Sequence, residues 1–349
     1  MAAKLNILVT GGTGFLGRAI IHELLDEHVP LSIASVTILG LKERSAWIDD
    51  RIQYVQGDIC NREEMNRACA GIDLVIHTAA IVDWGTKRPE EVYRVNFEGT
   101  RNVVEACRSN QVKWLLYTSS LDVVMTGKPL TNIDESQPYP ARHLNMYCES
   151  KCKAEQLVLS ANGEQLRTAV LRPADIWGEY DPYHLPPLIE MAKKGLYVRV
   201  GNGSALNQHI YVGNMAWAHV QIAKVLVDGQ QAMAGQAYFI TDGPGTNFFK
   251  FFDEIVIRSG YTIRPRNVWL PRWLMYAIGA ITEFLALLLR PIIYYSPKLS
   301  RFAVLYITTD FTFSSAKAKR DFGFEPKYSK EEAIARTAVF FRKPGKTHQ

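Results

Sequence analysis

Tyr147 and Lys151 stand four residues apart, at the start of a segment whose pattern predicts a helix over residues 152–159. At that spacing both side chains lie on one helical face. An ammonium beside a phenol favours the phenolate, which would lower a tyrosine pKa from about 10 toward the range used in proton-transfer catalysis. The pair predicts an acid–base catalyst, although most such pairs in proteins are solvated helix faces.

A glycine-rich turn stands near the start of the chain, between a predicted strand over residues 6–10 and a predicted helix over residues 18–25. Gly11 allows a tight turn, Gly14 lets the backbone approach a pyrophosphate, and Gly17 lets the helix pack on the strand. The phosphates would then face the N–H groups and the positive end of the helix dipole. The predicted phosphate site of a dinucleotide comprises Gly11, Gly14, Phe15, Leu16 and Gly17.

These residues need a sheet to position them, and strands alternate with helical stretches through the first half, as in βαβ units. A chain of 349 residues, 47% of them hydrophobic, can bury a large core. The expected fold class is α/β: a Rossmann-type doubly wound parallel sheet with a smaller C-terminal substrate-binding domain. We expect a nucleotide-binding domain over residues 1–175 and an interleaved substrate-binding region over 176–349. The strands expected in the first half cover residues 6–10, 35–39, 52–55, 74–77 and 114–118.

Charge and cysteine content argue against other classes of protein. A net charge of +5 without a dense basic run does not resemble a nucleic-acid-binding surface. The five cysteines are odd in number and lack metal-ligand spacing, so we expect reduced thiols, no metal site and a cytosol-facing protein. Only Met1 to Lys4 precede the first expected strand, and we therefore expect no secretory signal.

Residues at the ends of other strands are candidates for cofactor contacts. Asp58 follows the third strand, where a carboxylate could accept a hydrogen bond from an adenine amine, and Ile59 stands beside it. A turn or helix N-cap aspartate is the alternative interpretation of Asp58. Ala79 and Ala80 follow the fourth strand and leave room for the cofactor, whereas His77 before them is interpreted as a packed core histidine.

The end of the second strand bears on the choice of cofactor, because an acidic residue there normally binds the ribose 2′-hydroxyl of NAD. Gly40 stands at that point, with Lys42 and Arg44 close behind. Lysine and arginine would attract the 2′-phosphate of NADP, which a carboxylate would repel. NADP is therefore left open, with Glu43 and solvated surface charge as the competing interpretations.

Several motifs together resemble a known family. The chain is similar to the extended short-chain dehydrogenases/reductases and, more narrowly, to the 3β-hydroxysteroid dehydrogenases and the related sterol-4α-carboxylate 3-dehydrogenases. The likeness runs nearly end to end, which makes it more specific than either short motif. The stretches that carry it are residues 10–17, 117–120, 147–151, 171–179, 211–219 and 322–326.

The resemblance implies hydride transfer between a secondary alcohol and NAD or NADP, with NAD favoured by the family. Tyr147 would take the hydroxyl proton, and Lys151 would lower the tyrosine pKa and bind the nicotinamide ribose. Ser120 would hydrogen-bond the substrate oxygen, with Ser119 as the neighbouring alternative.

Three further positions follow from the same resemblance. Asn96 matches an asparagine that supports a proton relay in many family members, although a helix N-cap is an equal interpretation. Pro173 would shape the nicotinamide pocket through backbone rigidity. Isomerising members carry an acidic pair where this chain has Asp242 followed by Gly243. That departure leaves a 5-ene to 4-ene isomerase step open.

The segment over residues 273–289 is apolar except for Thr282 and Glu283. Its length falls just short of the roughly 20 residues needed to cross a bilayer, and Glu283 would add about 2.5 kcal/mol or more to insertion. We expect this segment to lie in or against a membrane surface. A buried core helix and a true membrane span are the alternatives.

The sequence thus predicts a membrane-associated, NAD(P)-dependent dehydrogenase that oxidises the 3β-hydroxyl of a steroid or sterol to the ketone. The alternatives within enzymes are a decarboxylating sterol-4α-carboxylate 3-dehydrogenase and a reductase of another lipophilic ketone. A catalytically idle nucleotide-sensing protein is the alternative outside enzymes. The expected location is the cytosolic side of the endoplasmic reticulum in a eukaryote. Assembly into a homodimer is left open.

Overall fold

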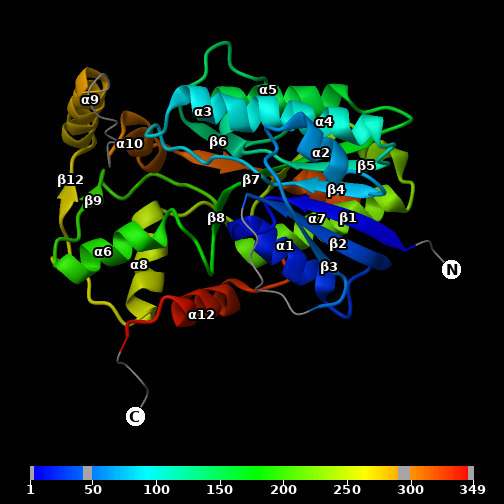
Figure 1. Cartoon of the computed structure of the whole chain (residues 1–349). Helices are drawn as coiled ribbons and strands as arrows, with labels where there is room; N and C mark the ends of the chain where they lie inside the picture. Colours follow the sequence, from blue (N-terminus) through cyan, green and yellow to red (C-terminus); the bar gives the residue numbers. More distant parts are fainter. Residues whose placement is uncertain (1–3, 42–48, 290–298, 345–349) are drawn as a thin grey trace.

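The computed structural model describes residues 4–41, 49–289 and 299–344. Its centre is a seven-stranded parallel sheet in the order β11-β7-β5-β4-β1-β2-β3, the predicted doubly wound α/β fold (Figure 1). The strands are β1 (Leu5–Thr10), β2 (Ile33–Gly40), β3 (Ile52–Gln56), β4 (Leu74–His77), β5 (Trp114–Thr118), β7 (Arg167–Pro173) and β11 (Gln236–Ile240).

The strand order reverses next to β1, because β2 and β3 extend the sheet in one direction and β4, β5 and β7 in the other. In such sheets a crevice opens beyond the carboxyl ends of the strands at this reversal. The central strands are apolar runs buried on both faces, as parallel strands covered by helices must be. The glycine turn follows β1 directly, so the sheet delivers it to the crevice.

Helices cover both faces of the sheet (Figure 1). On one face, α1 packs against α7, and their apolar residues share a core with β1 and β2. On the other face, α2 packs against α4 and α4 against α5, around a second apolar core. These helices are α1 (Phe15–Leu25), α2 (Arg62–Ala68), α3 (Pro89–Tyr93), α4 (Thr100–Ser109), α5 (Met146–Ser160) and α7 (Val212–Val227), with a π-helical turn, η1 (Arg94–Gly99), between α3 and α4.

Smaller elements gather beyond the carboxyl edge of the sheet. Three two-stranded parallel pairs lie there: β8 (Asp175–Trp177) with β10 (His209–Tyr211), β9 (Arg199–Val200) with β12 (Trp269–Leu270), and β6 (Leu130–Ile133) with β13 (Phe311–Phe313). The remaining helical elements are η2 (Leu121–Val124), α6 (Leu185–Lys194), η3 (Gln231–Met233), α8 (Phe248–Arg258), α9 (Arg272–Leu289), α10 (Arg301–Ile307), α11 (Ala316–Phe322) and α12 (Lys330–Phe340).

The two halves of the chain exchange strands. β11, from the second half, forms an edge of the main sheet, while β6, from the first half, pairs with the late strand β13. The division at residue 175 remains a prediction, since the sheet itself draws on both sides of that boundary.

The apolar segment forms a helix, α9, which stands at the rim of the molecule (Figure 1). Among the described residues it is long and apolar enough to cross a membrane, and 6% of it is buried. Its buried residue is Gly279, where an added Cβ would lie 3.0 Å from the backbone nitrogen of Arg301. Glu283 binds the Arg301 side chain at 2.6 Å, so its charge faces α10. The structure therefore excludes a buried core helix.

Candidate active site

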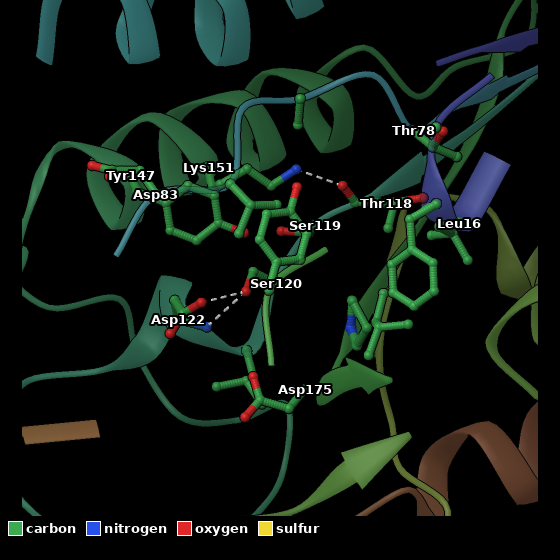
Figure 2. Close-up of a pocket in the computed structure, with 18 of the residues that line it drawn as sticks. Leu16, Thr78, Asp83, Thr118, Ser119, Ser120, Asp122, Tyr147, Lys151 and Asp175 are labelled. Carbon is green, nitrogen blue, oxygen red and sulfur yellow. Dashed lines mark hydrogen bonds between the residues drawn. The ribbon is translucent and has the colours of Figure 1, made fainter. Parts of the chain in front are cut away.

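One pocket joins the glycine turn to the predicted catalytic residues at the carboxyl edge of the sheet (Figure 2). Its first part is lined by the turn after β1 and by small residues after β4. Its middle is lined by the end of β5 and the first turns of α5. Its far part is a largely aromatic wall, to which Trp84 and residues from the second half of the chain contribute. The lining residues used below are Gly11, Gly14, Gly17, Ala79, Ala80, Asp83, Trp84, Ser119, Ser120, Asp122, Tyr147, Lys151, Pro173, Asp175, Tyr183, His184, Phe302 and Tyr306.

The glycine turn is shaped for a group that approaches its backbone closely. Gly11 has a φ of 71°, and a Cβ there would lie 2.8 Å from the Cα of Ala79. A Cβ on Gly17 would overlap the carbonyl oxygen of Gly11. Gly14 caps α1 without a side-chain hydrogen bond, so the first N–H groups of the helix are left for a ligand. The turn therefore fits a pyrophosphate, with Phe15 and Leu16 supplying backbone beside it.

The other predicted cofactor residues divide into two groups. Ala79, Ala80 and Pro173 line the pocket beside the glycine turn. Asp58 and Ile59 do not line it. The Asp58 carboxylate accepts a hydrogen bond from the Cys60 backbone at 2.9 Å, which matches the alternative interpretation of a turn aspartate. Lys42 falls outside the described residues.

Helix α5 presents Tyr147 and Lys151 to the pocket one turn apart, as their spacing predicts. The helix begins at Met146 because the Asn145 side chain caps it by accepting from the Cys148 N–H at 2.9 Å. Ser120 follows β5, and its hydroxyl donates to the carboxylate of Asp122 at 2.6 Å. Figure 2 shows Tyr147 and Lys151 on one side of Ser120 and Asp122 on the other. The structure thus brings together the predicted serine, tyrosine and lysine.

The electrostatics of the pair differ from the expectation. Burial and then the nearby Asp122 carboxylate raise the pKa of Tyr147 well above its usual value, against a hydrogen bond with Ser120 that lowers it. Burial lowers the pKa of Lys151 to about 7, although Glu155 and Asp122 oppose this. The Lys151 ammonium donates to the Thr118 carbonyl at 2.6 Å and lies 4.4 Å from the centre of the Tyr117 ring. In this arrangement the pKa of Tyr147 is therefore raised rather than lowered, and the Lys151 ammonium is bound to Thr118.

Asn96 lies next to the pocket but not in its lining. It belongs to the π-helical turn η1, and its amide accepts from the Ile81 N–H at 2.8 Å and donates to the Ile81 carbonyl at 2.9 Å. The amide also reaches the Ser150 hydroxyl at 3.3 Å. Asn96 is thus not a helix N-cap. It fixes the segment after β4 against α5.

Sequence reasoning missed a polar group in the far part of the pocket. The group contains the carboxyls of Asp122 and Asp175 and the imidazole of His184. The imidazole lies between two carboxylates, with Nε2 at 3.6 Å from Asp175 and Nδ1 at 3.2 Å from Asp181. Burial lowers the pKa of His184, but the two carboxylates outweigh it and raise the value to about 10. A usable signal existed, because Asp122 stands two residues after Ser120 and Asp175 two residues after Pro173.

Asp242, considered for an isomerase step, lies elsewhere. Its carboxylate accepts from the Tyr211 N–H at 2.5 Å and from the Asn214 amide at 3.2 Å, and it does not line the active-site pocket. Burial raises the pKa of Asp242 to about 7 against these two hydrogen bonds. Its contacts hold the start of α7 and give it no access to a substrate in this pocket.

Comparisons with known proteins find a matching family, similar sequences and a similar fold. Residues 8–272 match the model of the 3-beta hydroxysteroid dehydrogenase/isomerase family. The chain is 36% identical to human 3 beta-hydroxysteroid dehydrogenase type 7, over 97% of this chain and 96% of that protein. It is 31% identical to mouse sterol-4-alpha-carboxylate 3-dehydrogenase, decarboxylating, over 95% and 90%. A solved dTDP-glucose 4,6-dehydratase from Streptomyces venezuelae, with NAD bound, superposes with a TM-score of 0.74 at 19% identity, covering 97% of each chain.

Proposed function

Because the chain belongs to the 3-beta hydroxysteroid dehydrogenase/isomerase family, we propose that it oxidises the 3β-hydroxyl of a steroid or sterol to the 3-ketone, with NAD or NADP as hydride acceptor. Membership confirms the resemblance and the enzyme class predicted from the motifs. One observation carries the proposal for this chain: Ser120, Tyr147 and Lys151 share a pocket with a glycine turn shaped for a dinucleotide.

The residues of the pocket have distinct tasks in this reaction. Tyr147 holds the substrate hydroxyl and accepts its proton, while Ser120 lies beside it to bind the same oxygen. Lys151, anchored at the Thr118 carbonyl, would bind the nicotinamide ribose. A bound nicotinamide would accept the hydride, and its positive charge would favour the phenolate that burial alone disfavours.

The far wall of the pocket supports a flat, apolar substrate. Trp84, Phe302 and Tyr306 pack on one another there, with the Trp84 and Tyr306 rings 5.1 Å apart and nearly perpendicular. Aromatic rings of this kind supply broad apolar contact surface at low conformational cost. A fused-ring steroid fits such a wall better than a nucleotide sugar, whose hydroxyls would need many polar partners.

A second candidate, oxidation of a 4α-carboxysterol, is favoured by the mouse relative of that name. It requires the same hydride and proton transfer from this chain. The 3-ketone formed would be a β-keto acid, which loses carbon dioxide readily. The two candidates therefore differ in the substrate and in the mass of the product, and not in the residues that act.

We further propose that α9 anchors the enzyme on a membrane surface, in a eukaryotic cell that of the endoplasmic reticulum. Eighteen residues make a helix of about 27 Å, slightly short of a hydrocarbon core of about 30 Å. On the face of α9 that contacts the protein, Thr282 donates to the Leu299 carbonyl and Glu283 pairs with Arg301 of α10. The side chains of Trp273 and Phe284 are 71% and 64% exposed. A helix with this division of faces lies along an interface.

The enzymatic proposal is tested with a panel of 3β-hydroxysteroids and 4α-carboxysterols, each with NAD⁺ and NADP⁺. Absorbance of the reduced nicotinamide and product mass are followed together. We expect turnover of at least one 3β-hydroxysteroid and a loss of about 10²–10⁴-fold in Tyr147→Phe, because the phenol is the proton acceptor. Loss of carbon dioxide from a carboxysterol would select the second candidate. Turnover that survives Tyr147→Phe unchanged would refute the assignment.

The membrane proposal is tested by sedimentation with phosphatidylcholine vesicles. We expect wild-type protein to sediment with them and Trp273→Ser/Phe284→Ser to remain in solution, because both rings lie on the outward face of α9. The matched control is Ile257→Ser, which removes an apolar side chain that is 57% exposed on α8. Equal sedimentation of the double variant and the wild type would contradict this role of α9.

A further inference from the structure

Ser120, which shares the pocket with the catalytic phenol, is hydrogen-bonded to a buried carboxyl. The Ser120 hydroxyl donates its hydrogen to Asp122 at 2.6 Å, so what it offers to a neighbour is a lone pair. Tyr147 lines the same pocket, and the Ser120 side chain is among the groups that act on its pKa. With the Ser120 hydrogen held by Asp122, a bond between the two hydroxyls would have Tyr147 as its donor. Figure 2 shows Ser120 between the Tyr147 side of the pocket and Asp122. Together with the Ser120–Asp122 bond, such a bond from Tyr147 would form a chain that carries a proton from Tyr147 to the carboxylate.

The residues that the family resemblance assigns to proton handling are engaged elsewhere. Lys151 donates to the Thr118 carbonyl, and Asn96 is bound to both backbone groups of Ile81. Asn96 also lies outside the pocket lining. Among the described residues, the titratable side chain at the end of the hydrogen-bond chain from Tyr147 is Asp122.

Asp122 is placed to change its protonation state. It is 9% exposed, and its second oxygen, Oδ1, is buried without a hydrogen-bond partner. Burial raises the pKa of Asp122 to about 7; the Ser120 hydrogen bond and Lys151 lower it, and Asp175 raises it. The titratable groups that face it are Tyr147, Cys148 and Lys151 of α5, Asp175 of β8 and Tyr306 of α10.

The neighbouring carboxyl, Asp175, differs from Asp122 in having a histidine partner. Asp175 lies 3.6 Å from the imidazole of His184, whose pKa Asp181 and Asp175 raise to about 10 against its burial. Asp175 is therefore paired with the imidazole of His184. Asp122 has no such ion pair among the described residues, and so it is the carboxyl of the pair that can take up a proton.

We propose that Asp122 accepts the Tyr147 proton through Ser120 and so generates the phenolate that begins oxidation. The Tyr147 O–H bond breaks as its proton passes to Ser120 Oγ, and the original Ser120 proton passes to Asp122 Oδ2. Ser120 then directs its new O–H back toward Tyr147 and the substrate oxygen. When the alcohol yields its hydride and gives its proton to the phenolate, the one proton released by the reaction is the one held on Asp122.

The first test needs no steroid, so it stands apart from the proposed function on which the inference otherwise rests. Infrared difference spectra of the full chain at pH 8 are recorded as NAD⁺ is added. We expect a protonated-carboxyl band together with tyrosinate absorbance in the wild type, because the nicotinamide charge drives the proton to Asp122. Both signals should vanish in Tyr147→Phe, and the carboxyl band should vanish in Asp122→Asn. A wild-type spectrum without the carboxyl band, or a band that survives Asp122→Asn, would overturn the relay.

The second test uses the pH dependence of kcat for oxidation. Asp122 must be ionised, which gives a limb that rises through about pH 7; Lys151 must be protonated, which gives a falling limb. Asp122→Asn still accepts from Ser120, but we expect it to abolish the rising limb and lower kcat about 10²-fold. Asp122→Glu should restore that limb. Asp175→Asn should move it to lower pH, because Asp175 raises the pKa of Asp122.

These outcomes separate the relay from a structural role. A purely structural Asp122 would change thermal stability or KM and leave the rising limb in place, which would overturn the proposal. In the double variant Ser120→Ala/Asp122→Asn we expect no loss of kcat beyond that of Ser120→Ala, since both act in one chain. Additive losses would show that Asp122 acts independently of Ser120. If no steroid is turned over, the proposed function fails while the infrared result still decides the relay.

Discussion

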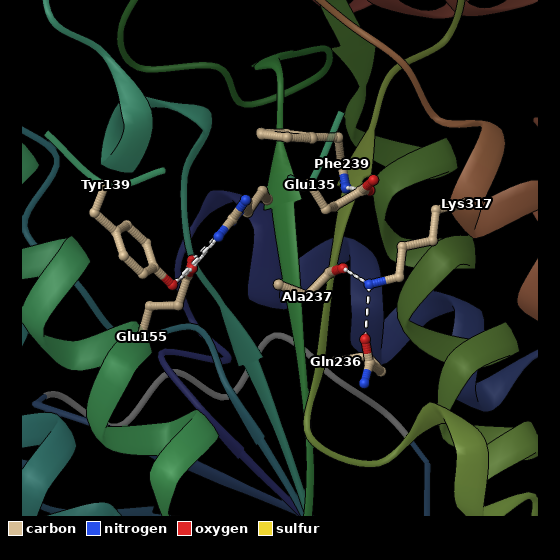
Figure 3. Close-up of polar contacts among 8 residues, drawn as sticks. Glu135, Tyr139, Glu155, Gln236, Ala237, Phe239 and Lys317 are labelled. Carbon is tan, nitrogen blue, oxygen red and sulfur yellow. Dashed lines mark hydrogen bonds and ion pairs between the residues drawn. The ribbon is translucent and has the colours of Figure 1, made fainter. Parts of the chain in front are cut away.

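Helix α5 contributes to two buried sets of polar side chains, and the two sets differ in how completely their polar atoms are paired. One turn beyond Lys151, Glu155 accepts from Arg172 at 2.6 Å and from the Tyr139 hydroxyl at 2.6 Å (Figure 3). The guanidinium also lies 5.0 Å from the centre of the Phe239 ring, and its Nη1 atom is the member of this network without a partner. This Glu155–Arg172 network matches a buried anion with a buried cation through three charge-assisted hydrogen bonds.

The active-site pocket leaves several such atoms unmatched. Oxygen atoms of Ser119, Asp122 and Asp175 and a ring nitrogen of His184 are buried there without a hydrogen-bond partner. Buried polar atoms of this kind cost stability unless a ligand or a reaction uses them. The comparison indicates that the Glu155–Arg172 network holds α5 against β7, whereas the pocket keeps its polar atoms available for substrate and proton transfer.

The largest expected effect breaks the Glu155–Arg172 network. Glu155→Ala should lower the free energy of unfolding by about 3–5 kcal/mol, because it leaves the buried Arg172 charge uncompensated. The matched control is Glu149→Ala on the same helix, which removes an exposed pair with Lys153 and should cost about 0.3–0.5 kcal/mol. Urea denaturation followed by circular dichroism measures both. Equal losses would mean that the network adds nothing beyond a surface pair.

In the pocket, replacing a buried carboxyl should stabilise the protein instead of destabilising it. The gain in free energy of unfolding should depend on pH, because Asp122 titrates. Its pKa is about 7 in the folded protein, compared with the ordinary aspartate value of 3.8. The folded protein therefore binds a proton that the unfolded chain releases between about pH 4 and pH 7, and stability from this group falls as pH rises through that window. A shift of about three units corresponds to at most about 4 kcal/mol. Relative to the wild type, Asp122→Asn should become more stable from pH 4 to 7 and level off above. A constant difference across the window would contradict the buried, titrating carboxyl.

The sequence predicted the parts of this comparison that depend on local pattern. The glycine turn, the first five strands and the Tyr147–Lys151 pair follow from motif and periodicity, whereas Ser120 follows from the family resemblance. The structure places the glycine turn and these three residues in one pocket. The resemblance to the 3β-hydroxysteroid dehydrogenases is confirmed by family membership. The roles of the individual site residues remain predictions.

What escaped sequence reasoning depends on contacts between distant segments. His184 reaches the pocket through the connection before α6, and Tyr306 through α10, more than 100 residues after Tyr147. No spacing rule relates such positions. The electrostatics escaped for the same reason, because the burial that raises the pKa of Tyr147 comes from these later segments as well as from its own helix. Spacing alone predicted that Lys151 would lower the pKa of Tyr147, whereas burial raises that pKa.

The smallest of these effects distinguishes two adjacent serines within the pocket. Ser120 and Ser119 both line it, but the Ser120 hydroxyl is bonded to Asp122, whereas the Ser119 hydroxyl has no partner. Ser120→Ala should lower kcat about 10²-fold, or about 2.7 kcal/mol in activation free energy, because it removes both a contact to the substrate oxygen and the link to Asp122. Ser119→Ala should change kcat less than about threefold, since a hydroxyl without a partner loses little on removal. Steady-state oxidation with one 3β-hydroxysteroid measures the two variants side by side. If Ser119→Ala were the more damaging change, the oxygen-binding serine would be Ser119, and the hydrogen-bond chain to Asp122 would lie beside the reaction rather than in it.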